Sequence, residues 1–89
     1  MATSVAKRGK EEALAIAALD HATALRKQPG CLGAYVLNER GTGIQMSLAI
    51  FESEDTFNRG TEATMPVIAK HHLEELRKGG STFRLFDVR

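Results

Sequence analysis

The feature of this sequence that most constrains its fold is a pair of apolar segments, residues 32–38 and 44–51, joined by a short loop that contains Gly41 and Gly43. Glycine accepts positive φ at no steric cost, so the loop favours a reversal of the chain and the segments are predicted to form a β-hairpin. Neither segment alternates cleanly between apolar and polar residues. Strands of this kind are typical of a sheet that is covered on both faces.

Each predicted strand carries apolar side chains on both faces, because successive residues of a strand point in opposite directions. The first strand divides into Leu32, Ala34 and Val36 on one face and Tyr35 and Leu37 on the other. In the second strand, a row of larger side chains faces away from Ala49 and Phe51. This row consists of Ile44, Met46, Leu48 and Ile50.

The segment from Lys10 to Lys27 is predicted to be a helix because it is rich in alanine and leucine, which are strong helix formers. Acidic Glu11 and Glu12 lie in its first turn and basic residues in its last turn, which matches the helix dipole. Its apolar face has helical spacing. That face consists of Leu14, Ala18, His21, Ala22 and Leu25. Pro29 and Gly30 end the helix.

A second helix is predicted to begin at the N-cap Ser53, with acidic residues in its first turn and Phe57 as an apolar anchor. Gly60 and then Pro66 are expected to break or bend it before a second helical run over 66–78, which Gly79 and Gly80 end. The apolar face of that run consists of Met65, Ile68, Ala69, His72, Leu73 and Leu76.

A strand over 82–88 closes the chain, and a weaker strand signal over 3–7, with Val5 as its large apolar residue, opens it. The predicted order is β-α-β-β-α-β in one domain, residues 1–89. This α+β order is the ferredoxin-like plan, in which helices cover one face of a four-stranded antiparallel sheet.

A chain of 89 residues buries only about 64% of its unfolded surface, so its core is small. Two helices cover one face of such a sheet and leave the second face exposed. Because three of the strands carry large apolar residues on both faces, this exposed face would be a larger apolar patch than soluble monomers normally have. We therefore expect a homodimer, in which two sheets pack face to face through the sheet face as a dimeric α+β barrel.

Composition excludes several functional classes. The net charge of +1 and the single tyrosine give no support to nucleic-acid binding. No segment approaches the ~20 apolar residues of a membrane span, and no signal peptide is evident. The single cysteine, Cys31, is read as an inert thiol and favours a reducing compartment, so the expected location is the cytoplasm.

Four segments resemble the antibiotic biosynthesis monooxygenase-like family of dimeric α+β barrels. Residues 29–35 resemble its PGxxG start of the second strand, and residues 51–57 its aromatic-Glu-Ser-Glu-x-x-Phe junction between third strand and second helix. Residues 7–14 resemble its first strand-to-helix turn, and residues 83–88 its closing strand. The resemblance implies a pocket between helices and sheet. Some members of the family oxidise phenols or quinols with dioxygen and no cofactor, and others degrade haem.

The haem-degrading branch combines an Asn on the first strand with a Trp and an iron-ligating His on the second helix. This chain has no Asn in its first strand, and Gly60 stands at the Trp position, with His71 and His72 slightly beyond the His position. The resemblance therefore favours cofactor-free oxidation over haem degradation.

His72 is the candidate general base, because its predicted helical face also carries Ile68 and Leu76 and an imidazole titrates near neutral pH. Tyr35 is the candidate that orients a substrate oxygen. His71 lies about 100° further around the helix and is expected at the rim or in solvent. Alternatively, His72 is a histidine at the edge of the core or the dimer interface.

Further side chains are candidates to bind a flat apolar or aromatic molecule, although such residues also build ordinary cores. They are Met46, Phe51, Phe57, Met65, His71 and Asn38. No metal site is expected, because the adjacent histidines point apart on a helix. No cofactor is expected either.

Two functions remain open. The first is a small cofactor-independent monooxygenase acting on an aromatic or quinol-like molecule, with His72 as base and Tyr35 as orienting residue. The second is a non-catalytic homodimeric module that binds a small apolar ligand. A cavity with a histidine or tyrosine at its tip favours the first, and a space filled by Leu and Met side chains favours the second.

Overall fold

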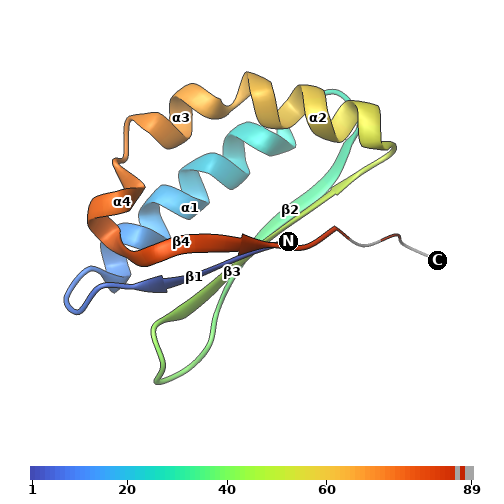
Figure 1. Cartoon of the computed structure of the whole chain (residues 1–89). Helices are drawn as coiled ribbons and strands as arrows, with labels where there is room; N and C mark the ends of the chain where they lie inside the picture. The colour runs from blue at the N-terminus through green and yellow to red at the C-terminus, as the bar shows by residue number, and fades with distance from the viewer. Residues whose placement is uncertain (86, 88–89) are drawn as a thin grey trace.

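The computed structural model describes residues 1–85 and 87. Its elements in chain order are β1 (Ala2–Ala6), α1 (Glu11–Arg26), β2 (Cys31–Asn38), β3 (Ile44–Phe51), α2 (Glu54–Ala63), α3 (Met65–Ala69), α4 (Leu73–Leu76) and β4 (Arg77–Phe83). The strands form one antiparallel sheet in the order β2-β3-β1-β4, and the helices lie on one face of it (Figure 1). The predicted ferredoxin-like fold is therefore confirmed.

The first half of the chain follows the sequence prediction closely. The hairpin strand β3 has the predicted bounds, and β1, α1 and β2 begin and end within one residue or so of theirs. The doubtful first strand is central in the sheet, because it pairs with β3 on one side and β4 on the other. Backbone pairing from two neighbours therefore compensates for its weak strand propensity.

The predicted helix over 66–78 is wrong. Helix α3 ends at Ala69, His72 adopts a left-handed conformation with φ 48°, and the short α4 follows. Gly60 does not break α2 but lies inside it, and the helix ends instead at the Thr64 cap, after which Pro66 occupies the first turn of α3. Because a left-handed residue separates α3 from α4, His72 does not share a helical face with Ile68 and Leu76.

The closing strand begins earlier than predicted. Strand β4 spans Arg77–Phe83, so Gly79 and Gly80, expected to cap a helix, lie within a strand. Gly79 has φ 62°, and the register between β1 and β4 shifts nearby, between Thr3 and Val5. A glycine with positive φ at a register shift is the usual chemistry of a bulge. Of the predicted strand over 82–88, Phe86 and Val88 lie outside the described residues.

The buried core lies between the helices and the sheet, and it is small. It is built mainly of alanine, with two leucines from α1. Its members are Ala6, Leu14, Ala17, Ala22, Leu25 and Ala34. Val36, Ala49 and Phe51 are partly buried and pack against it. Those contacts identify the face of β2 and β3 that the helices cover.

The opposite side of the sheet, named the open face, carries the alternate residues of the hairpin strands. Tyr35 pairs with Leu48 and Leu37 with Met46 across this face, and Tyr35 and Leu37 are 49% and 50% exposed. The chain exposes 6266 Å² in total. That is about a fifth more than the roughly 5,100 Å² typical of a monomer of this mass. The open face is the surface that the predicted partner would cover.

Candidate functional site

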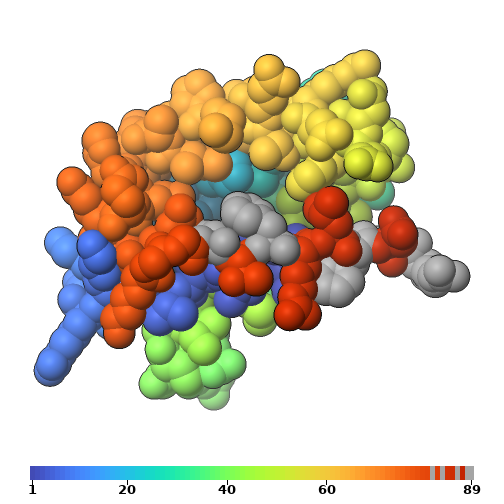
Figure 2. Space-filling model, in the orientation of Figure 1, coloured from blue at the N-terminus to red at the C-terminus, as the bar shows by residue number. Residues whose placement is uncertain are grey.

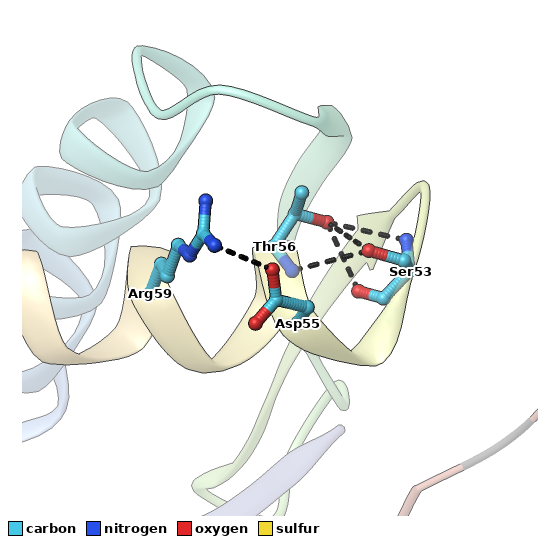
Figure 3. Close-up of polar contacts among 4 residues, drawn as sticks. All are labelled: Ser53, Asp55, Thr56 and Arg59. Atoms are coloured by element: carbon cyan, nitrogen blue, oxygen red, sulfur yellow. Dashed lines mark hydrogen bonds and ion pairs between the residues drawn. The ribbon is translucent and has the colours of Figure 1, made fainter.

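The predicted N-cap at Ser53 is confirmed, and a capping box fixes the junction between β3 and α2. The backbone N–H of Thr56 donates to Ser53 Oγ at 3.2 Å, and the backbone N–H of Ser53 donates to Thr56 Oγ1 at 3.2 Å (Figure 3). Asp55 and Arg59 form an ion pair of 2.9 Å one turn later, with both side chains largely exposed. The reciprocal bonds set where the helix begins.

The Pro29-Gly30 turn packs directly onto this cap. Gly30 has φ 81°, and a Cβ at this position would lie 2.6 Å from the Cβ of Thr56. The backbone N–H of Glu52 donates to the Gly30 carbonyl at 2.8 Å. Residues 29–35 and 51–57, two of the segments that resemble the family, thus meet in space. Position 30 requires glycine because its φ is positive and because a Cβ would collide with Thr56.

Two aromatic rings lie beside the junction. Phe51 and Phe57 pack edge to face, with ring centroids 5.7 Å apart and an interplanar angle of 78°. A Cβ at Gly60 would lie 2.8 Å from Cε1 and Cζ of Phe51. Gly60 therefore provides the space for the Phe51 ring, which explains a glycine in the interior of α2. It also leaves no room at this position for the Trp of the haem-degrading pattern.

The end of β3 borders a hollow of about 630 Å³, named the junction hollow. Most of its lining is apolar, and acidic side chains complete it. Its lining residues are Met1, Leu32, Leu48, Ala49, Ile50, Phe51, Glu52, Ser53, Glu54, Phe57, Leu85 and Asp87. In the space-filling view the described end of the chain (red) lies near the yellow-green surface of α2 and the preceding strand (Figure 2).

A second hollow of about 570 Å³, named the hairpin hollow, lies between the β2–β3 loop and the start of α1. Asn38 borders it, together with Arg8 and the acidic first turn of α1. Gln45 also lines this hollow, and the residue is buried, with 5% of its surface exposed. Its Oε1 accepts no hydrogen bond from the part of the chain that the structure describes. This hollow is polar and carries charges of both signs.

The two adjacent histidines lie on the helix side of the molecule, away from both hollows. His72 is exposed at its left-handed turn, and its Nδ1 is 3.8 Å from a Glu74 carboxylate oxygen. His71, expected at the rim or in solvent, is the more buried of the two, with a side chain 22% exposed against 66% for His72, and its Nε2 bonds to Asp20 Oδ2 at 2.8 Å. The pKa of the Asp20 carboxyl is lowered, chiefly by this bond to His71 and next by the bond from Lys70 Nζ to Asp20 Oδ2 at 3.0 Å. This cluster ties the α3–α4 turn to α1.

His21 is the other half-buried histidine. The hydroxyl of Thr64, a residue 1% exposed, donates to the Gly60 carbonyl at 2.9 Å, so Thr64 Oγ1 accepts from His21 Nε2 at 2.9 Å. Burial lowers the pKa of His21, and this effect is larger than that of the nearby Asp20 carboxylate, which raises the pKa. The contact joins α1 to the end of α2.

The structure therefore brings together only part of the predicted site. Phe51 and Phe57 share the junction hollow, and Asn38 borders the hairpin hollow. Tyr35 and Met46 lie on the open face, and Met65 is 54% exposed on α3. Among the described residues, neither hollow is lined by a histidine or a tyrosine.

Sequence reasoning missed the acidic rim of the junction hollow. Glu52 and Glu54 line it, and the signal was present in the Phe-Glu-Ser-Glu segment at the strand-to-helix junction. Over the described ranges, no group of three or more His, Cys, Asp or Glu side chains is arranged to hold a metal ion. Within the same ranges, no helix has the length and apolar character that crossing a membrane requires.

Comparison with known proteins supports the fold and shows the family. No curated protein matches the chain. Rv0793 from Mycobacterium tuberculosis shares the fold with a TM-score of 0.79 at 14% identity, and the match covers 98% of this chain and 92% of that one. PA3566 from Pseudomonas aeruginosa shares it with a TM-score of 0.74 at 19% identity, and the match covers 96% of this chain and 90% of that one. The model of the antibiotic biosynthesis monooxygenase family matches residues 1–64. That match covers the capping box, the Pro-Gly turn and both rings of the junction hollow, so the chain belongs to the antibiotic biosynthesis monooxygenase family.

Proposed function

We propose that this protein is a small homodimeric oxygenase that oxidises an aromatic or quinol-like molecule with dioxygen and without a resident cofactor. The observation that carries the proposal is the junction hollow, where Phe51 and Phe57 present two aromatic rings. Its volume of about 630 Å³ lies within the range of small-molecule sites, roughly 300–1,000 Å³. Family membership supplies the reaction class.

The hollow suits a flat ring for a physical reason. Aromatic side chains bind another ring through edge and face contacts, each such pair being worth about 0.5–1.5 kcal/mol beyond the area it buries. Leu48, Ile50 and Leu85 extend the apolar lining. A substrate that lay in this hollow would leave its hydroxyl groups toward the polar side, where Ser53 and the acidic side chains lie.

The proposed chemistry needs no external reductant, because a quinol supplies all the electrons. One oxygen atom of O₂ forms a bond to a ring carbon, and that carbon loses its hydrogen. The other oxygen atom leaves as water, with hydrogens that come from the ring and its hydroxyl groups. Quinol and dioxygen thus give hydroxyquinone and water, and the four electrons that reduce O₂ come from the substrate. The protein holds the ring, excludes bulk water and provides a proton acceptor.

The assignments of His72 as base and Tyr35 as orienting residue stay predictions. Both lie outside the junction hollow in a single chain, His72 at an exposed turn and Tyr35 on the open face. A role for Tyr35 in the reaction would therefore require the second protomer to bring its own elements near. Mutation tests the two residues separately.

The exposed area of the chain supports the proposed homodimer. The chain exposes about a fifth more surface than expected, on the order of 1,100 Å², and a stable interface buries about 800 Å² of each partner. We assign this interface to the open face, which carries the half-exposed side chains of Tyr35 and Leu37. Leu48 and Ile50 of the junction hollow belong to it, so a second protomer packed there would close one side of the hollow.

Oxygen uptake tests the proposal. An electrode records O₂ consumption with 1,4-naphthohydroquinone, corrected for autoxidation without protein, for the wild type and for Phe57→Ala. We expect the protein to accelerate uptake and Phe57→Ala to lower kcat/KM about tenfold, since it removes one ring of the pair. Met65→Ala, an exposed position outside the hollow, is the matched control and keeps the wild-type rate. Uptake no faster than autoxidation would refute the oxygenase, and an unchanged rate in His72→Ala would remove that base.

One observation favours the second function, the non-catalytic ligand-binding dimer. No histidine or tyrosine lines the junction hollow among the described residues, so the base expected for phenol ionisation is missing from it. Under this alternative the protein binds an aromatic ring in the same hollow and leaves oxygen uptake at the rate of autoxidation. Measuring binding and uptake on the same sample separates the two functions.

A further inference from the structure

We infer that the junction hollow selects its ligands by charge: it takes uncharged hydroxylated aromatic molecules and rejects aromatic anions, with Glu52 and Glu54 as the specificity-determining residues. The inference rests on the proposed function, because it assigns the substrate class of the same hollow. It goes beyond that function, since the oxygenase chemistry alone does not distinguish a neutral quinol from a carboxylated one.

The hollow has an apolar lining and an acidic rim. Leu48, Ile50 and the ring pair provide contacts for an aromatic ring, whereas Glu52, Glu54 and Asp87 add three carboxylates. Met1 is the residue with a positive group among the described lining residues, and its ammonium donates to the Arg84 carbonyl oxygen at 2.7 Å. Carboxylates therefore dominate the charge that a bound ligand meets.

Among the described residues, no cation forms an ion pair with these carboxylates. On α2 the charge of Asp55 is compensated by Arg59 at 2.9 Å, but no basic side chain of the described residues pairs with Glu52, Glu54 or Asp87. A charge without a partner acts on whatever enters the hollow beside it. Asp55, which has its partner, is not among the residues that line the hollow.

The acidic rim is also fixed in position. The backbone N–H of Glu52 is bound to Gly30, and Glu54 begins α2 directly after the capping box of Ser53. The N-terminus of a helix ordinarily attracts anions through its dipole. Here the carboxylate of Glu54 lies in that first turn, so the helix dipole is offset by the protein's own charge and is not available to an anionic ligand.

Hydrogen-bond chemistry defines the preferred ligand. An ionised carboxylate only accepts hydrogen bonds, so it matches a phenolic O–H, which donates. A quinol or other hydroxylated ring satisfies the rim and the apolar lining together. A ring that carries a carboxylate or sulfonate has no proton to donate from that group and is repelled. Each exposed charge pair changes affinity by about two- to fivefold, so two carboxylates discriminate by about tenfold.

A matched pair of probes tests the inference: 6-hydroxy-2-naphthoate, an anion at neutral pH, and its uncharged methyl ester. Binding to the full-length protein is measured by calorimetry at low salt, for the wild type and for the double variant Glu52→Gln and Glu54→Gln. Glu62→Gln, an exposed position on α2 outside the hollow, is the control for the loss of an acidic charge. All three substituted residues are exposed, so the variants keep the fold, which circular dichroism verifies.

We expect the wild type to bind the ester about tenfold more tightly than the anion, and the double variant to bind both within about twofold. Glu62→Gln should keep the wild-type ratio, and added salt should reduce it. Equal affinity for ester and anion in the wild type overturns charge selection and leaves the oxygenase proposal standing. An unchanged ratio in the double variant also overturns the inference. Failure of both probes to bind overturns the hollow as the site, and with it both proposals.

Discussion

Replacing Gly30 by alanine should destabilise the protein strongly, because the substitution is unfavourable for two separate reasons. Gly30 has φ 81°, a conformation that costs an alanine about 1–2 kcal/mol. The new Cβ would also lie 2.6, 2.7 and 2.8 Å from three side-chain atoms of Thr56. Thr56 cannot retreat without breaking the capping box with Ser53, so overpacking adds about 1–3 kcal/mol. Together the free energy of unfolding falls by about 2–5 kcal/mol.

Gly41 offers a matched control for this prediction. It has φ 80°, almost the same as Gly30, but a Cβ there would meet nothing within 4 Å. Gly41→Ala should therefore cost only the conformational part, about 1–2 kcal/mol. Urea unfolding followed by circular dichroism, at one protein concentration for all variants, measures both losses. Equal destabilisation by the two substitutions would refute the contact between the Pro-Gly turn and the α2 cap.

Three further substitutions test other parts of the structure. If the proposed homodimer forms through the open face, Leu48→Glu should give a monomer in sedimentation, whereas Ile16→Glu, an exposed apolar position on α1, should not disrupt the dimer. A dimeric Leu48→Glu would contradict the proposed interface. Burial lowers the pKa of His21, so the unfolded chain binds more protons and stability falls as pH drops below the unfolded value of about 6.5. His21→Gln should flatten this slope in pH-dependent unfolding, and an unchanged slope would contradict the burial of this imidazole. Arg59→Ala removes an exposed ion pair and should change the free energy of unfolding by less than about 1 kcal/mol, a limit that urea unfolding checks.

Local signals in the sequence were sufficient for most of the fold. The hairpin, the first helix and the N-cap at Ser53 follow from glycine, alanine and serine chemistry that acts within a few residues. The exposed position of Tyr35 on an open apolar face also follows, because side chains alternate along a strand. Membership of β1 in the sheet was signalled only by the order of elements, since its stability comes from two neighbouring strands.

The second half of the chain could not be predicted in the same way. Gly79 and Gly80 resemble the end of a helix, but pairing with β1 places them in a strand, and the helix before them is divided by the left-handed His72. Gly60 resembles a helix breaker, yet its role is to admit the ring of Phe51. Both outcomes depend on contacts with residues distant in the sequence. The left-handed conformation of His72 was likewise not predicted, and its role as base stays a prediction.

The central claim is that the junction hollow is the ligand site, and amide chemical-shift mapping tests it most directly. A titration of the isotope-labelled protein with 2-naphthol, an uncharged hydroxylated ring that dioxygen does not readily oxidise, reports which backbone amides sense the ligand. We predict that the shifted amides cluster over 48–57, the end of β3 and the start of α2, where Phe51 and Phe57 lie. Shifts that cluster instead over 38–45, around the hairpin hollow, or along α3, would contradict the account.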